Sequence, residues 1–183
     1  SSLSPLSGHT FLERRYLIVP GIRSSRIYII DVKDPLKASI HKTIEPEEVV
    51  SKTGYSRPHT IHCGPEGIYV SCLGGSGKDG TDGPPGIFIM DCETFDIIGQ
   101  YEMDRGKQVK HYVFWWNLPQ NYMVSSEWGL PPQFENGVVP EDLLSNKYGH
   151  SIHFWDLRKR KNIQTVDFGE NYQMALEIRP AHD

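Results

Sequence analysis

The chain has 183 residues and a formal net charge of −4, and 11% of its residues are aromatic. Its 17 glycines and 13 prolines favour many short strands joined by turns and argue against a helical bundle. The negative charge argues against a general nucleic-acid binder, and no run of about 18 apolar residues predicts a transmembrane helix.

Runs rich in Val, Ile, Tyr and Phe follow one another along the whole chain and predict an all-β fold. The strongest runs cover 15–20, 26–31, 67–72, 86–91, 121–126 and 151–156. Weaker runs cover 38–44, 58–63, 95–103, 111–116, 162–168 and 174–179. Short helices are expected only at 45–50 and 140–147, where a proline can occupy the first turn.

One strand motif occurs three times and ends each time in an aspartate: Asp31, Asp91 and Asp156, which are 60 and 65 positions apart. Between the repeats the strands fall into groups of four, which is typical of the four-stranded antiparallel blades of a β-propeller. We therefore expect about three blades: an incomplete blade at 1–53, blades at 54–107 and 108–171, and the start of another at 172–183. A self-contained β-sandwich is the alternative.

The strand at 58–63 places two imidazoles and a thiol close together, namely His59, His62 and Cys63. Imidazole suits copper, zinc and iron, and thiolate favours softer ions such as Cu(I). In a flat strand His59 would share a face with Cys63 and not with His62, so joint ligation by the histidines needs a bend or a bulge. A stable metal site also needs further ligands, and packed or hydrogen-bonded histidines are the alternative.

A second candidate, Glu127, ends a strand that should be central in its blade, next to Trp128. Glu127 could serve as a general base or orient a metal ligand, with Trp128 as a pocket wall. Alternatively, Glu127 pairs with a cation such as Arg179 while Trp128 belongs to the core. His153 lies inside a repeat motif, and we expect it to be a packed or surface strand residue.

Five segments together resemble the selenium-binding protein family, whose members include methanethiol oxidases. They are RYLIVPG at 15–21, SSRIY at 24–28, HTIHC at 59–63, SEW at 126–128 and LEIR at 176–179. The resemblance runs over essentially the whole chain and is closer to microbial members than to vertebrate ones. It implies a seven-bladed propeller, of which these residues would form the N-terminal-to-middle part.

The resemblance also implies a reaction, the oxidation of methanethiol by O2 and water to formaldehyde, hydrogen sulfide and hydrogen peroxide, with copper implicated. The family's His-x-x-His-Cys motif maps onto His59 and His62 as copper ligands and Cys63 as a selenium or thiol contact. Glu127 would then accept a proton or orient a ligand histidine without binding the metal itself. The family's selenium-associated cysteine would stand just before Ser1, so we expect these residues alone to lack a complete active site.

A non-enzymatic carrier of selenium or thiols, or a propeller scaffold that binds other proteins, is the alternative function. A carrier would need Cys63 exposed and reactive, whereas a structural cysteine would be buried and inert. The three cysteines, odd in number, favour a reducing compartment, so we expect a cytoplasmic protein. A periplasmic location would follow if a signal peptide preceded Ser1.

Overall fold

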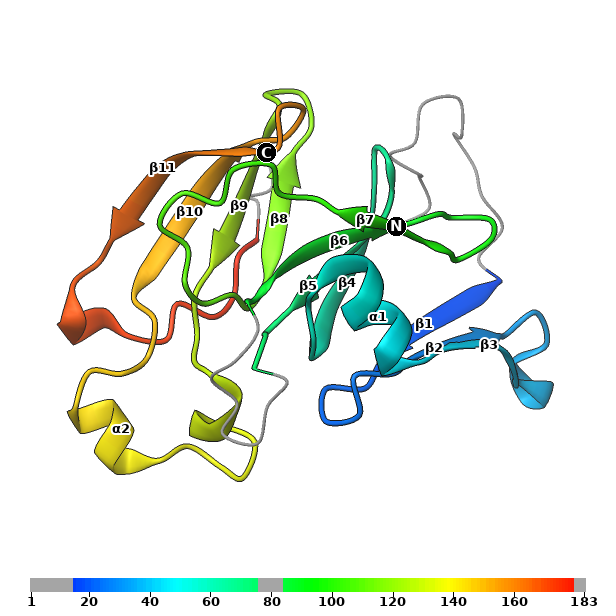
Figure 1. Cartoon of the computed structure of the whole chain (residues 1–183), viewed down its shortest axis with the longest axis horizontal. Helices are drawn as coiled ribbons and strands as arrows, with labels where there is room; N and C mark the ends of the chain where they lie inside the picture. Colours follow the sequence, from blue (N-terminus) through cyan, green and yellow to red (C-terminus); the bar gives the residue numbers. More distant parts are fainter. Residues whose placement is uncertain (1–14, 76–83, 180–183) are drawn as a thin grey trace.

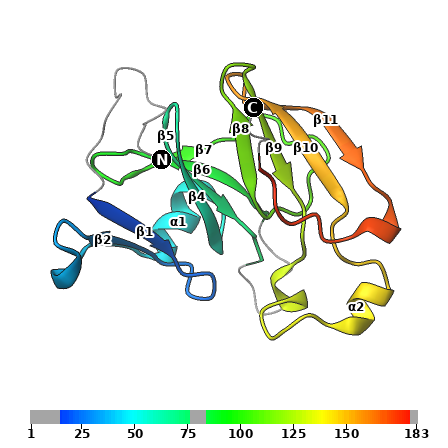
Figure 2. The same ribbon diagram turned by 180° about the vertical axis from the view of Figure 1, so that it is seen from behind.

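The computed structural model describes residues 15–75 and 84–179, which form three antiparallel sheets side by side in chain order (Figure 1, Figure 2). The first sheet contains β1 (Tyr16–Pro20), β2 (Ile27–Asp31) and β3 (Ser39–Ile44). The second contains β4 (Pro58–Gly64), β5 (Gly67–Cys72), β6 (Gly86–Met90) and β7 (Ile97–Gln100). The third contains β8 (Phe114–Asn117), β9 (Tyr122–Ser126), β10 (Ser151–Asp156) and β11 (Lys161–Asp167). The predicted all-β fold of propeller type is confirmed, while the exact blade boundaries remain a prediction.

Alternating side chains of the second sheet pack against both neighbouring sheets, so that β5 and β6 are buried throughout. Ile68 and Val70 belong to a cluster shared with the first sheet, whereas Tyr69, Ile87 and Ile89 belong to a cluster shared with the third. Because successive strand residues point to opposite faces, one apolar strand serves two interfaces. This packing explains why both strands are apolar over 68–70 and 87–90 instead of alternating with polar residues.

The aspartates of the repeat motif end their strands and hold the following turns. Asp31 Oδ1 accepts a hydrogen bond from Lys33 N at 2.9 Å, and Asp156 Oδ1 accepts one from Lys159 N at 2.9 Å. Asp91 Oδ1 accepts two, from the amides of residues 93 and 94 at 2.8 and 2.7 Å. The repeated Asp is therefore a turn residue, because a short acceptor side chain can satisfy backbone amides that leave the ladder.

Helices are short. The predicted ones form as α1 (Pro46–Thr53) and α2 (Pro140–Leu144), each with proline at its start. Helix α1 is capped at its C-terminus by Gly54, whose φ of 72° is in the left-handed region that favours glycine. Short 3₁₀ turns lie at Pro35–Lys37, Pro131–Gln133 and Glu170–Tyr172. Among the described residues, no helix is both long and apolar enough to cross a membrane.

The weak strand predicted at 174–179 is wrong, because these residues follow an irregular path. The described part of the chain offers them no strand to pair with. Instead, Met174 N donates to Gly149 O at 2.8 Å, and Leu176 O accepts from Ser126 Oγ at 2.9 Å. Residues 180–183 of the expected further blade lie outside the described residues.

A long connection between β9 and β10, residues 127–150, extends away from the sheet that it belongs to and carries α2 (Figure 1). Its Glu135 carboxylate forms an ion pair with Arg57, with Nη1 and Oε1 2.9 Å apart, and its backbone oxygen accepts a hydrogen bond from Arg23. Arg57 precedes the second sheet, and Arg23 lies in the β1–β2 turn. The connection therefore contacts turns of both other sheets.

Candidate functional site

A bulge in β4 determines where the two motif histidines lie. The ladder pairs Pro58 with Cys72 but Ile61 with Val70, so β4 holds one residue more than β5 over this stretch. Beyond the bulge, Ile61 packs against the cluster shared with the first sheet. In a regular strand His59 and His62 would point to opposite faces. The bulge lies at this position and interrupts that alternation, as joint ligation of a metal ion by both histidines requires.

Both imidazoles lie against the segment that contains β8. The His59 ring lies 4.5 Å from the Tyr112 ring, centroid to centroid. The His62 ring meets Phe114 at 5.3 Å, Trp115 at 4.6 Å and Trp116 at 5.9 Å, each edge-on. The two histidines therefore face the same interface, between the second and third sheets, and aromatic rings enclose much of their surroundings.

The surroundings keep both imidazoles neutral at pH 7. Burial lowers the pKa of His59, although a backbone hydrogen bond with Tyr112 opposes this. Burial, with the Arg179 cation as the next cause, lowers the pKa of His62 to about 4. His59 Nδ1 is 2.8 Å from Thr60 Oγ1, while His62 Nε2 is buried and has no hydrogen-bond partner. A neutral imidazole with a free ring nitrogen can ligate a metal ion.

Cys63 is exposed and forms no disulfide. Nearby protein atoms partly desolvate its sulfur and raise the pKa of the thiol above its usual value. Exposure is what a thiol carrier requires, but the thiol stays protonated at neutral pH and is not activated as a nucleophile.

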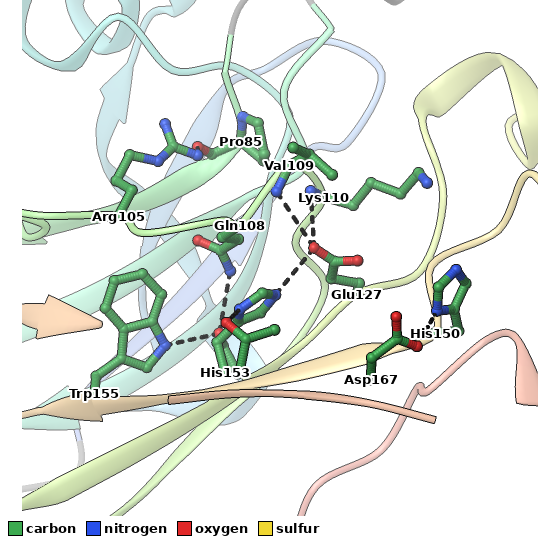
Figure 3. A network of polar contacts seen from close by, with 12 residues as sticks. Pro85, Arg105, Gln108, Val109, Lys110, Glu127, His150, His153, Trp155 and Asp167 are labelled. Carbon is green, nitrogen blue, oxygen red and sulfur yellow. Dashed lines mark hydrogen bonds and ion pairs between the residues drawn. The ribbon is translucent and has the colours of Figure 1, made fainter. Parts of the chain in front are cut away.

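Glu127 lies in a buried polar network that involves neither motif histidine (Figure 3). Its Oε1 accepts a hydrogen bond from His153 Nε2 at 3.0 Å and from the amides of Val109 and Lys110 at 3.3 and 3.4 Å. His153 Nδ1 in turn contacts Thr165 Oγ1 at 3.0 Å. Glu127 is therefore held by three donors from two separate segments.

The alternative partner predicted for Glu127 is wrong. Arg179 pairs with Glu177, with Nη2 and Oε1 2.6 Å apart, and lies over the Trp115 ring. Trp128 lies outside the two main clusters; it stacks on Phe134, with ring centroids 4.1 Å apart, and meets Tyr112 edge-on at 4.9 Å. The irregular path of 174–179 carries Arg179 past β9 and towards β8, away from Glu127.

Two further buried histidines, His111 and His153, lie outside the motif, and the sequence assigns them no chemical role. His153 is 1% exposed and shares the inward face of β10 with Trp155, whose Nε1 donates to Ser125 Oγ at 2.9 Å. His111 is fully buried, and neither of its ring nitrogens has a hydrogen-bond partner. Burial lowers the pKa of His111 to about 3. His153 and Trp155 are two positions apart and therefore lie on the same face of the strand. This spacing is the feature of the sequence that points to burial of His153.

No group of three or more His, Cys, Asp or Glu side chains within 15–75 and 84–179 is arranged to hold a metal ion. His59 and His62 thus offer at most two ligands from this part of the molecule.

Comparison with known proteins gives one consistent result. A sequence model of the family described as "56kDa selenium binding protein (SBP56)" matches residues 1–183. The chain is 40% identical over 172 residues to a methanethiol oxidase of Danio rerio, covering 93% of this chain and 37% of that protein. It is 37% identical over 185 residues to selenium-binding protein 3 of Arabidopsis thaliana, covering 100% of this chain and 38% of that protein.

A solved structure agrees with these matches. The crystal structure of a hypothetical selenium-binding protein from Sulfolobus tokodaii superposes with a TM-score of 0.84 at 53% identity, covering 93% of this chain and 37% of that one. The chain thus spans less than two-fifths of the length of these relatives.

Proposed function

Because the chain belongs to the 56 kDa selenium-binding protein family, we propose that it forms part of a methanethiol oxidase-like enzyme. The reaction would convert methanethiol, O2 and water to formaldehyde, hydrogen sulfide and hydrogen peroxide. The observation that carries the proposal is the pair of neutral histidines, His59 and His62, which the β4 bulge leaves facing one interface.

The donor chemistry of this pair fits copper, since imidazole is a good copper ligand and His62 Nε2 is buried without a partner. We propose that His59 and His62 supply two ligands and that the others come from outside the described residues. Bound copper would supply electron transfer between the substrate sulfur and O2.

The residues around the histidines would prepare them for this role. The contact between Thr60 Oγ1 and His59 Nδ1 leaves Nε2 as the ligating nitrogen, because a ring nitrogen in a hydrogen bond orients the other. Tyr112 fixes the plane of the same ring from one side. The aromatic side chains beside His62 shield part of its ring from water and thereby favour the unprotonated form.

Glu127 would support the site indirectly. By accepting from the amides of Val109 and Lys110, it holds the segment that leads into Tyr112, whose ring packs at a tilt against His59. We therefore propose Glu127 as a positioning residue that acts through the backbone. A direct hydrogen bond to a metal ligand is not needed for this role.

The test compares the full-length protein with a variant that carries His59→Ala and His62→Ala. We expect copper content and methanethiol-dependent peroxide production to fall together, because two ligands are lost. His41→Ala is the matched control, since His41 is an exposed histidine on β3. If the double variant keeps both its copper and its peroxide production, the site assignment is wrong.

A non-enzymatic carrier of selenium or thiols is the second candidate, and the exposed free thiol of Cys63 favours it. Labelling with a thiol reagent, before and after incubation with selenite and glutathione, distinguishes the two functions. A carrier predicts protection of Cys63 and no peroxide from methanethiol. The oxidase predicts peroxide production that a Cys63→Ser variant retains.

A further inference from the structure

The segment 174–179 is tied to the third sheet and thereby placed beside His62. Its two anchors are the hydrogen bonds from Met174 N to Gly149 O and from Ser126 Oγ to Leu176 O. Three residues after Leu176, the guanidinium carbon of Arg179 lies 4.9 Å from the centroid of the Trp115 ring. The position of Arg179 is therefore set by contacts that are separate from the histidine motif.

Trp115 brings Arg179 and His62 together. The His62 ring meets the same indole edge-on, with ring centroids 4.6 Å apart. The Arg179 cation is also close enough to be, after burial, the largest cause of the lowered pKa of His62. A cation, an indole ring and an imidazole with a free, buried nitrogen thus form one group of side chains at the interface of two sheets.

Arg179 has hydrogen-bonding capacity that no described residue uses. Within the described residues, its one ion pair is that from Nη2 to Glu177, and its side chain is 58% exposed. A guanidinium carries five N–H donors in a planar arrangement, so most of them are available to a ligand. Guanidinium groups over aromatic rings are suited to small anions, because the ring holds the cation in place without neutralising it.

We propose that Arg179 is a specificity-determining residue that selects the anionic form of the sulfur or selenium ligand at the His62 face. The ligand class is a small, soft monoanion such as a thiolate, with Arg179 donating to the anionic atom. Trp115 offers apolar surface to an attached methyl group. The identity of the ligand as methanethiolate rests on the proposed function, whereas recognition of a small soft anion does not.

Iodide is a suitable probe, because it is a soft monoanion that quenches indole fluorescence on contact. Acrylamide, a neutral quencher, reports exposure alone. The fluorescence of Trp115 is obtained in the full-length protein as the difference from a Trp115→Phe variant made in each background. This measurement needs neither bound copper nor turnover.

We expect Arg179→Gln to reduce iodide quenching of Trp115 by about twofold or more, the effect of losing one partly exposed charge, while acrylamide quenching stays unchanged. Arg179→Lys should restore part of the effect. The matched variant Glu177→Gln, which removes the neighbouring anion, should increase iodide quenching. Equal iodide quenching in the wild type and Arg179→Gln, or parallel changes with both quenchers, overturns the proposal.

A kinetic assay of methanethiol oxidation provides a separate test. If the wild type oxidises methanethiol, Arg179→Gln should raise KM more than it lowers kcat, with copper content unchanged. An unchanged KM contradicts a role in substrate recognition. A wild type that produces no peroxide refutes the proposed function, and the iodide experiment still decides whether Arg179 recognises anions.

Discussion

Glu102 is a carboxyl group that the fold removes almost entirely from water. It accepts hydrogen bonds from Tyr55 Oη at 2.9 Å and from Ile87 N at 2.6 Å, and only 7% of its surface is exposed. Burial, the largest effect, raises the pKa of Glu102 from its usual 4.5 to about 7. The folded protein therefore binds a proton here that the unfolded chain has released by neutral pH.

The direction of the pH dependence follows from this difference. The contribution of Glu102 to the free energy of unfolding is fully present below about pH 4.5 and is lost as the pH rises through about 7. We expect Glu102→Gln to make the free energy of unfolding less dependent on pH between these values. Urea unfolding of the wild type and the variant at several pH values measures this dependence. Identical pH dependences in the two proteins would contradict the raised pKa of Glu102.

At the scale of elements, the sequence predicted well those features that depend on residues close together in the chain. Strand alternation and the Asp-terminated motif located the strands of all three sheets, because both depend on local geometry. Contacts across long separations were not predictable: Glu127 meets His153, 26 positions away, where Arg179 was the suggested partner. The strand at 174–179 failed for a related reason, since a strand depends on a neighbour to pair with.

The turn after β6 provides a prediction at this scale. Replacing Asp91 by alanine removes the acceptor of the amides of residues 93 and 94, and we expect the free energy of unfolding to fall by about 1 kcal/mol. Asp91→Asn keeps a side-chain oxygen and should lose less. Equal losses in the two variants, measured by urea unfolding, would show that the negative charge matters and not the hydrogen bonds.

For the whole molecule, the interfaces between sheets carry the packing energy. Trp155 is fully buried in the cluster shared by the second and third sheets. Truncating it leaves a cavity at that interface and removes the hydrogen bond from its indole N–H to Ser125 Oγ, which keeps only the one from Gln108 Nε2 at 3.1 Å. We expect Trp155→Ala to lower the free energy of unfolding by about 3–5 kcal/mol.

Ile163 on β11 serves as the control, because its side chain is 62% exposed. Ile163→Ala should change the free energy of unfolding by no more than about 0.5 kcal/mol. Chemical denaturation of the two variants compares the outer strand with the interface. A similar loss in both would mean that the cluster is not the main source of stability.

The contacts of Glu135 with Arg57 and Arg23 affect how the sheets come apart. Modules stacked in a row and touching only their immediate neighbours can lose an end module while the others stay folded. The connection between β9 and β10 adds a link from the third sheet to the turn of the first, past the sheet between them. Opening of either outer sheet must break this link, so the link adds a coupling between the local unfolding of two sheets that are not neighbours.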